Sequence, residues 1–158
     1  MTMAERVAGA FTRRDVEGIV ACFTEDATYG DLFYGEAAGH DGLRALFGRM
    51  LEEAAEAEWT IDTAVASPSV EIAEWTFRFV VGDAVPRSAG RTVAMRGASV
   101  FELRDGLCCA YREYFDRGVG YIQLGLEPAT LHHVLSRQSR SVRRAPERRA
   151  TPEKTLKT

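Results

Sequence analysis

Apolar residues recur at helical spacing at the start of the chain. Met3, Val7, Ala10 and Phe11 follow one another at steps of one, three and four residues, which predicts a short amphipathic helix. A second short helix is predicted directly afterwards, with Asp15 as its N-cap. Its apolar face is formed by Val16, Ile19, Val20 and Phe23. We therefore expect the chain to open with two short helices.

A strand and a longer helix are predicted next. Residues 28–32 have the composition of a strand, and Glu25 and Asp26 before it are expected to be surface turn residues. A glycine-containing loop follows. The segment "GHDGLRALFGRMLEEAAEAE" then predicts a helix capped by Asp41, because its apolar residues form one stripe. The stripe consists of Leu43, Leu46, Phe47, Met50 and Leu51.

The second half of the chain changes to the composition of β-strands. Four segments are rich in β-branched and aromatic residues: "WTIDTAVAS", "VEIAEWTFRFVV", "RTVAMRGASVFEL" and "LCCAYREYFD". The letters "RDG" between the last two are a strong hairpin signal. Helices followed by an antiparallel meander predict an α+β fold, in which a curved sheet is covered by the helices.

The pattern divides the chain into three parts. Residues 1–126 hold the elements above and are long enough for one domain with a single core. A short helical extension is expected over residues 127–138. Residues 139–158 contain few apolar residues, two prolines and many basic residues, which predicts a disordered tail.

Positive charge is concentrated at the C-terminal end. From Arg137 onward eight basic residues accompany two acidic ones, so this end carries +6 and the rest of the chain −9. The net charge of −3 provides no overall field for nucleic acid or a membrane surface, and neither is expected as a partner. The basic tail is instead a candidate contact for an acidic partner.

The cysteines and the N-terminus indicate the compartment. Cys22, Cys108 and Cys109 are odd in number and lack CxxC spacing, which is typical of a reducing environment. Glu5 lies where a signal peptide needs an apolar run, and no stretch of about 18 apolar residues follows. The sequence therefore predicts a cytoplasmic protein.

The sequence contains no motif for a metal, a nucleotide or a serine nucleophile. HExxH, GxGxxG, GxxxxGK[ST] and GxSxG are all missing. The three histidines, His40, His132 and His133, lack the spacing of metal ligands. We accordingly expect no metal and no cofactor.

Polar residues on two predicted strands are the remaining candidates for chemistry. Alternation in "VEIAEWTFRFVV" places Glu74, Thr76 and Arg78 on one face and the apolar residues on the other. Charged strand residues are mostly exposed, which favours a solvated face over a cavity. Asp31, at the end of "FTEDATYGD", has two interpretations: a local turn acceptor or an acid that points into a pocket.

The words "FTEDATYGD", "GHDGLRALF", "VFELRDG" and "YREYFDRGVGYIQLG" resemble the NTF2-like superfamily, and within it the SnoaL-like branch, over roughly residues 3–125. Relatives there include ketosteroid isomerases, limonene epoxide hydrolases and polyketide cyclases. The resemblance implies a cone, in which a curved, mostly antiparallel sheet wraps around N-terminal helices. It also implies a homodimer and a pocket for a hydrophobic small molecule. Because this fold hosts many reactions, the activity must be argued from the site.

Residue by residue, the resemblance implies two catalytic carboxylates. The segment "GIVACFTEDATYGD" places the base of the isomerases on Asp31, and "REYFD" places the second carboxylate of the epoxide hydrolases on Glu113. The oxyanion tyrosine of the isomerases falls on Val7 and their oxyanion acid near Ser99. Both donors that would stabilise a dienolate are therefore missing or weakened, and a ketosteroid isomerase is not expected.

Further residues are expected to bind the substrate. Glu74 and Thr76 fall where the hydrolases carry an Arg-x-Asp pair, so the resemblance implies a cavity position for them. Tyr34, Ser99 and Tyr111 are candidate hydrogen-bond donors to a carbonyl, hydroxyl or epoxide oxygen.

These expectations describe a cofactor-free acid–base enzyme that acts on a hydrophobic, oxygenated small molecule of natural-product type. Asp31 would remove or relay a proton, and Glu113 would donate or position one. Polyketide-type cyclisation, epoxide opening and double-bond isomerisation all fit this pair. The alternative is a non-catalytic small-molecule-binding or dimerisation module. A deep pocket that holds both carboxylates would favour the enzyme, whereas a core filled by aromatic residues would favour the module.

Overall fold

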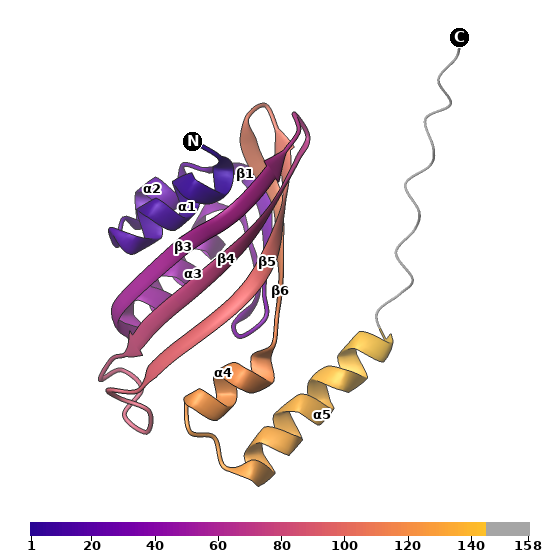
Figure 1. Ribbon diagram of the computed structural model, residues 1–158. Helices are drawn as coiled ribbons and strands as arrows, with labels where there is room; N and C mark the ends of the chain where they lie inside the picture. Colours follow the sequence, from indigo (N-terminus) through magenta and orange to yellow (C-terminus); the bar gives the residue numbers. More distant parts are fainter. Residues whose placement is uncertain (145–158) are drawn as a thin grey trace. The chain divides into compact units, whose positions relative to one another are not determined.

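The computed structural model describes residues 1–144 of the chain, with side chains as far as Arg140 (Figure 1). The chain falls into two compact units, Met1–Leu126 and a second unit that begins at Glu127. The strands of the described residues all belong to the first unit. This unit contains the candidate active site.

Two short helices open the chain, as the spacing of apolar residues predicts. Helix α1 (Met3–Thr12) begins with a capping box, in which Thr2 and Glu5 bind each other's backbone N–H groups. Helix α2 (Val16–Val20) is capped by Asp15, whose carboxylate accepts a hydrogen bond from Gly18 N at 2.8 Å. The predicted N-cap is therefore confirmed.

The N-terminal end of α1 is also held by a buried acid from the sheet. Glu71, which is 2% exposed, accepts hydrogen bonds from Met3 N at 2.9 Å and Ala4 N at 2.7 Å. A carboxylate is favourable there, because the first N–H groups of a helix lack partners and carry partial positive charge. Sequence reasoning missed this contact, since residues 68 positions apart give no local signal.

Replacing Glu71 with alanine should lower the free energy of unfolding by about 2 kcal/mol, because two buried N–H groups would lose their acceptor. Chemical denaturation measures the effect. Glu74→Ala, three residues along the same strand but exposed, is the matched control and should change stability little. Equal stability losses in the two variants would show that the Glu71 contact contributes nothing specific.

The strands next to α2 differ from the sequence prediction in two places. Strand β1 (Phe23–Asp31) begins five residues earlier than expected, so Glu25 and Asp26 are exposed strand residues rather than turn residues. Strand β2 (Gly35–Ala38) occupies the predicted glycine-containing loop and pairs antiparallel with β1. The pairing with β1 supplies the partners that such a short polar segment cannot specify on its own.

Helix α3 (Gly39–Glu53) has the predicted apolar stripe but different ends. Its N-cap is Ala38, whose side chain makes no capping hydrogen bond, and Asp41 lies inside the first turn. The prediction that Asp41 caps this helix is therefore wrong. The helix also ends at Glu53, because Ala54 is extended and pairs with Val81. The alanine and glutamate content of residues 54–58 favours a helix, but strand pairing overrides this preference.

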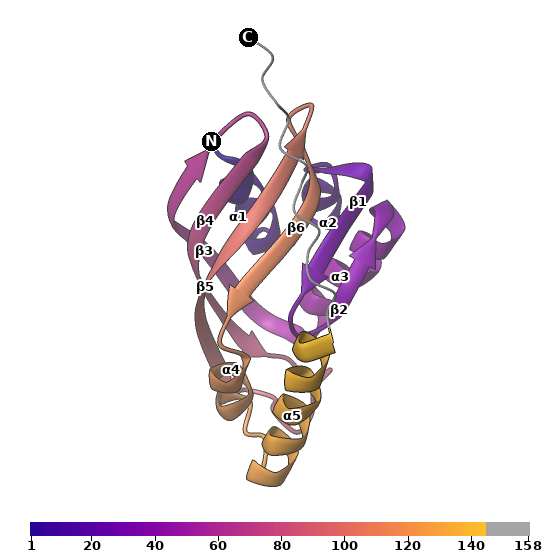
Figure 2. The same ribbon diagram turned by 90° about the vertical axis from the view of Figure 1, so that its right-hand side faces the viewer.

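The sheet contains the four predicted strands β3 (Ala54–Ala66), β4 (Val70–Val81), β5 (Thr92–Arg104) and β6 (Leu107–Phe115). Its order is β2-β1-β6-β5-β4-β3, and β1 runs parallel to β6 while the other neighbours are antiparallel. Asp105 and Gly106 both have positive φ, which is the geometry of the predicted tight hairpin between β5 and β6. Figure 2 shows α1 and α3 behind the curved, unclosed sheet. The predicted α+β, NTF2-like fold is confirmed.

Two further helices follow the sheet. Helix α4 (Arg117–Gln123) is capped by Asp116, which accepts hydrogen bonds from Gly118 N and Val119 N. Helix α5 (Pro128–Arg144) belongs to the second unit. Residues 139–144 are thus helical, so the tail predicted from residue 139 does not begin there, and its remainder, 145–158, lies outside the described residues. Within residues 1–144 no helix is long and apolar enough to cross a membrane.

Candidate active site

A cavity of about 270 Å³ lies in the unit Met1–Leu126, on the face of the sheet that the helices cover. Ten of its twenty lining residues are aromatic, which suits the flat apolar surface of a ring system. Typical ligand pockets begin at about 300 Å³, so this one fits a compact molecule. Its aromatic wall is formed by Phe11, Tyr29, Phe33, Tyr34, Trp59, Trp75, Phe77, Phe79, Phe115 and Tyr121.

Asp31 lines this cavity and is only 8% exposed. Alternation along β1 turns Ala27, Tyr29 and Asp31 inward. The Oδ1 atom of Asp31 accepts hydrogen bonds from Phe33 N at 2.6 Å and Tyr34 N at 2.7 Å. Both interpretations of Asp31 therefore apply: one carboxylate oxygen anchors the turn after β1, and the side chain still lies at the cavity.

Glu113 is the second carboxylate at the cavity and is 7% exposed. It lies on β6, where alternation turns Tyr111 and Glu113 inward and leaves Tyr114 exposed. Its Oε2 atom accepts a hydrogen bond from the Tyr111 hydroxyl at 2.9 Å, and Oε1 accepts one from Leu32 N at 3.1 Å. Because Leu32 follows Asp31 directly, the parallel pairing of β1 and β6 brings the two acids together.

The two acids lie close enough to interact electrostatically, and burial raises the pKa of both. Burial and then the charge of Asp31 raise the pKa of Glu113 to about 8. For Asp31 the backbone N–H groups of Tyr34 and Phe33 and the charge of Arg117 oppose the rise in pKa. At neutral pH we therefore assign the proton to Glu113 and the negative charge to Asp31.

Ser99 and Tyr111 lie behind the pair rather than at the cavity surface. Ser99 is fully buried and Tyr111 is 3% exposed, and neither lines the cavity. The Ser99 Oγ atom lies 2.7 Å from the Tyr111 hydroxyl, and it accepts a hydrogen bond from Trp75 Nε1 at 2.7 Å. These residues support Glu113, and the substrate-binding role expected for Ser99 and Tyr111 does not fit their positions.

Tyr34 lines the cavity, as a substrate-binding residue should, but its hydroxyl already has a partner. It donates a hydrogen bond to Glu53 Oε2 at 2.6 Å, and Arg49 Nε donates one to Glu53 Oε1 at 2.8 Å. The Arg49 guanidinium lies 5.1 Å from the centre of the Tyr34 ring. Sequence reasoning missed Arg49 and Glu53, although their spacing of four residues on one helix was a signal for this pair.

Glu74 and Thr76 do not reach the cavity. Glu74 is exposed, and the Thr76 hydroxyl donates a hydrogen bond to Asp62 at 2.8 Å. Their neighbour Trp75 lines the cavity, so alternation turns both residues to the other face of β4. The cavity position that the resemblance implied for them is corrected here, and the solvated face that the strand pattern favoured is the one observed.

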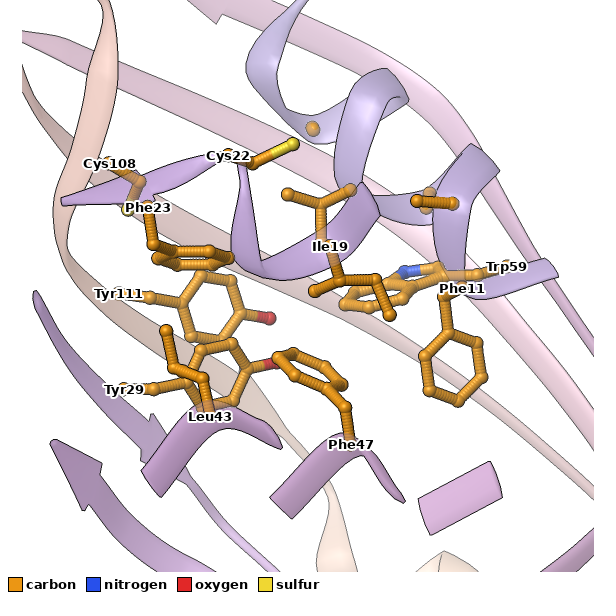
Figure 3. Close-up of a cluster of buried hydrophobic side chains, with 14 of the residues drawn as sticks. Phe11, Ile19, Cys22, Phe23, Tyr29, Leu43, Phe47, Trp59, Cys108 and Tyr111 are labelled. Carbon is orange, nitrogen blue, oxygen red and sulfur yellow. The ribbon is translucent and has the colours of Figure 1, made fainter. Parts of the chain in front are cut away.

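Tyr29 is a residue of the site that sequence reasoning missed. It lines the cavity, and its ring stacks on Tyr111 with centroids 4.0 Å apart and an interplanar angle of 14°. Figure 3 shows the hydroxyls of both tyrosines pointing in the same direction. The Tyr29 hydroxyl is buried and makes no hydrogen bond of normal geometry. Its position two residues before Asp31 was the available signal.

Among the described residues no group of three or more His, Cys, Asp and Glu side chains is arranged to hold a metal ion. The carboxylates of the site accept hydrogen bonds from N–H and O–H donors instead. The arrangement can hold one proton between two acids and present it to a ligand in an apolar cavity.

Solved structures of low sequence identity share this fold. An LEH-like epoxide hydrolase from M. tuberculosis is 20% identical, with a TM-score of 0.63 over 87% of this chain and 93% of that one. A putative polyketide cyclase from Silicibacter is 24% identical, with a TM-score of 0.63 over 72% and 86%. A hypothetical protein from Catenulispora acidiphila with a ketosteroid isomerase-like fold, in complex with trimethylamine, is 18% identical, with a TM-score of 0.71 over 80% and 96%.

No curated protein sequence matches the chain significantly. The SnoaL-like domain family, in contrast, matches residues 4–111, which is more than half of the chain and includes Asp31 and the strands β1 to β5. Together with the curved sheet and its aromatic-lined cavity, this match shows that the chain belongs to the SnoaL-like family.

Proposed function

We propose that this protein is a cofactor-free acid–base enzyme that acts on a compact, hydrophobic, oxygenated molecule. The observation that carries the proposal is the pair Asp31 and Glu113, two buried acids at the wall of one aromatic cavity. A carboxylic acid whose pKa lies near 8 can donate a proton at neutral pH, and a neighbouring carboxylate can accept one.

The two acids have different roles in this proposal. Glu113 transfers its proton to an oxygen of the substrate, and Asp31 takes a proton from a carbon of the substrate or from a water molecule. Oδ1 of Asp31 is occupied by two N–H groups, so Oδ2 is the oxygen that serves as the base. The aromatic lining of the cavity lowers the polarity around the pair, which strengthens both interactions.

Three reactions fit these roles: polyketide-type cyclisation, epoxide opening and double-bond isomerisation. The relatives described as a polyketide cyclase and an epoxide hydrolase support the first two as general types. Val7, which stands where the isomerases carry their oxyanion tyrosine, is fully buried in the core and has no donor, which makes isomerisation through a dienolate the least favoured.

A homodimer in the cytoplasm is the proposed setting. On the outer face of the sheet Ile72 is 50% exposed and Tyr114 is 56% exposed, which supports a second copy as the partner of this face. The three cysteines are free, which supports a reducing compartment.

Two probe reactions test the proposal against a binding module. Proton abstraction beside a carbonyl is followed by NMR as deuterium uptake into 2-tetralone in D₂O, and ring opening is followed as diol formation from styrene oxide. We expect at least one reaction to exceed the buffer rate by about a hundredfold. Saturable binding of both probes without any acceleration would favour the non-catalytic small-molecule-binding module instead.

A further inference from the structure

A buried chain of hydrogen bonds leads from the sheet to the candidate acid. Trp75 Nε1 donates to Ser99 Oγ at 2.7 Å, Ser99 Oγ lies 2.7 Å from the Tyr111 hydroxyl, and Tyr111 donates to Glu113 Oε2 at 2.9 Å. The three residues behind Glu113 are at most 3% exposed. They come from three neighbouring strands, so the sheet itself holds the chain in place.

The direction of this chain follows from the chemistry of its ends. An indole N–H can only donate, so it occupies a lone pair of Ser99 and turns the hydroxyl hydrogen of Ser99 away from Trp75. The remaining partner of that hydroxyl among the described residues is Tyr111. Tyr111 then accepts from Ser99 and has its own hydrogen free for Glu113. In the reverse order the Ser99 hydrogen would have no acceptor, which is costly in a buried site.

We propose that Trp75 and Ser99 are positioning residues, which hold the Tyr111 hydroxyl as a permanent hydrogen-bond donor to Glu113. The inference rests on the proposed acid–base function of Glu113 and adds two residues that act on it through Tyr111. The chain ends at an indole, which does not release its proton at neutral pH, so it cannot carry protons to solvent. Glu113 therefore exchanges its proton on the side of Asp31 and the cavity.

The pKa of Glu113 reports directly on this chain of hydrogen bonds. A donor to the carboxylate stabilises its charged form, and the Tyr111 hydrogen bond accordingly lowers the pKa of Glu113 against the larger effects of burial and of the Asp31 charge. The other titratable or charged groups around the pair include Tyr29 on β1, Tyr34 in the turn after β1 and Arg117 on α4. All three stay unchanged in the variants, so a change in the pKa of Glu113 reports on the chain of hydrogen bonds.

The experiment is a titration of Glu113 by NMR in protein labelled with ¹³C at the glutamate carboxyl, with the signal assigned by Glu113→Gln. We expect Tyr111→Phe to raise the pKa of Glu113 by about one pH unit. Ser99→Ala and Trp75→Phe should each raise it by about half a unit. In the first variant Tyr111 loses the donor that polarises its hydroxyl, and in the second Ser99 loses the residue that orients it as this donor.

Trp59→Phe is the matched control. Trp59 lines the same cavity and contacts Trp75 with ring centroids 6.0 Å apart, but its indole N–H makes no hydrogen bond. The substitution removes the same atoms as Trp75→Phe and should leave the pKa of Glu113 unchanged. Equal pKa values in the Trp75→Phe and Trp59→Phe variants would overturn the role of Trp75.

Ser99→Ala leaves the Trp75 N–H without an acceptor and can unfold the protein, so Trp75→Phe and Tyr111→Phe keep the inference testable. A Tyr111→Phe variant that folds and shows an unchanged pKa of Glu113 would overturn the proposal that Trp75, Ser99 and Tyr111 act on Glu113. The titration needs no substrate. If the variants shift the pKa of Glu113 as expected but no activity is found, the result counts against the proposed function. If activity is found but the pKa of Glu113 is the same in all variants, the result counts only against the chain of hydrogen bonds.

Discussion

Replacing Glu113 with glutamine should lower the turnover of the true substrate by about a hundredfold or more, which is the usual contribution of a general acid. Glutamine has the shape of glutamic acid, its single oxygen keeps one of the two hydrogen bonds from Tyr111 and Leu32 N, and its NH₂ group can donate to Asp31. It has no proton to transfer at neutral pH. The fold should therefore remain while the chemical step is lost.

Asp31→Asn should lower turnover to a similar extent. The asparagine oxygen can keep the two turn hydrogen bonds from Phe33 N and Tyr34 N, but it cannot accept a proton as a base. Measurement of kcat and KM separates this loss from a loss of binding, because removal of the base should change mainly kcat.

Asp116→Asn is the matched control for both variants. Asp116 is an exposed carboxylate three residues after Glu113, and it caps α4 by accepting from Gly118 N and Val119 N. Asparagine is an equally good N-cap, so stability and turnover should change little. Full activity in both Glu113→Gln and Asp31→Asn would contradict the acid–base mechanism. Activity lost only in the Glu113 variant would leave Asp31 as a positioning group.

The helices and the antiparallel strands could be predicted from sequence because they depend on short-range patterns, whereas the pocket position of Asp31 came from the family resemblance. Period-two alternation places Glu113 and Tyr111 on one face of β6, and the RDG turn joins β5 to β6. The strand pattern also favoured the exposed face for Glu74. For Glu74 and Thr76 the alternation of the strand was a better guide than the resemblance to distant relatives.

The contacts that define the candidate site were beyond the reach of sequence reasoning. Asp31 and Glu113 meet only because β1 runs parallel to β6, a pairing between strands about 80 residues apart. The hydrogen bond from Trp75 to Ser99 depends on the register of β4 against β5. Neither the choice of partner strand nor the register leaves a local signal in a single sequence.

The stability of the protein should fall as the pH rises from about 5 to about 8. The pKa of Glu113 is raised from 4.5 to about 8 in the folded state, so the folded protein binds this proton more tightly than the unfolded chain does. The contribution is fully present below pH 4.5 and is lost as the pH rises through 8. A difference of this size corresponds to roughly 4–5 kcal/mol. Asp31, whose pKa is also raised, changes stability in the same direction.

Glu113→Gln should remove most of this pH dependence. Glutamine is neutral at every pH, so the variant avoids a second buried negative charge next to Asp31. Near pH 4.5 the variant and the original protein should be of similar stability, and at pH 9 the variant should be more stable by several kcal/mol. Urea denaturation at a series of pH values measures both curves, with exposed Glu74→Gln as the control that should follow the original protein.

The outcome bears on function as well as on stability. An ionisable acid is retained in a buried, aromatic cavity although a neutral amide of the same shape would make the fold more stable near neutral pH, which is the trade-off expected of a group kept for its proton. A Glu113→Gln variant that is no more stable than the original protein at pH 9 would mean that Glu113 is ionised and well solvated in the fold. In that case Glu113 would have no proton to donate at neutral pH, and the proposed division of roles between Glu113 and Asp31 would be wrong.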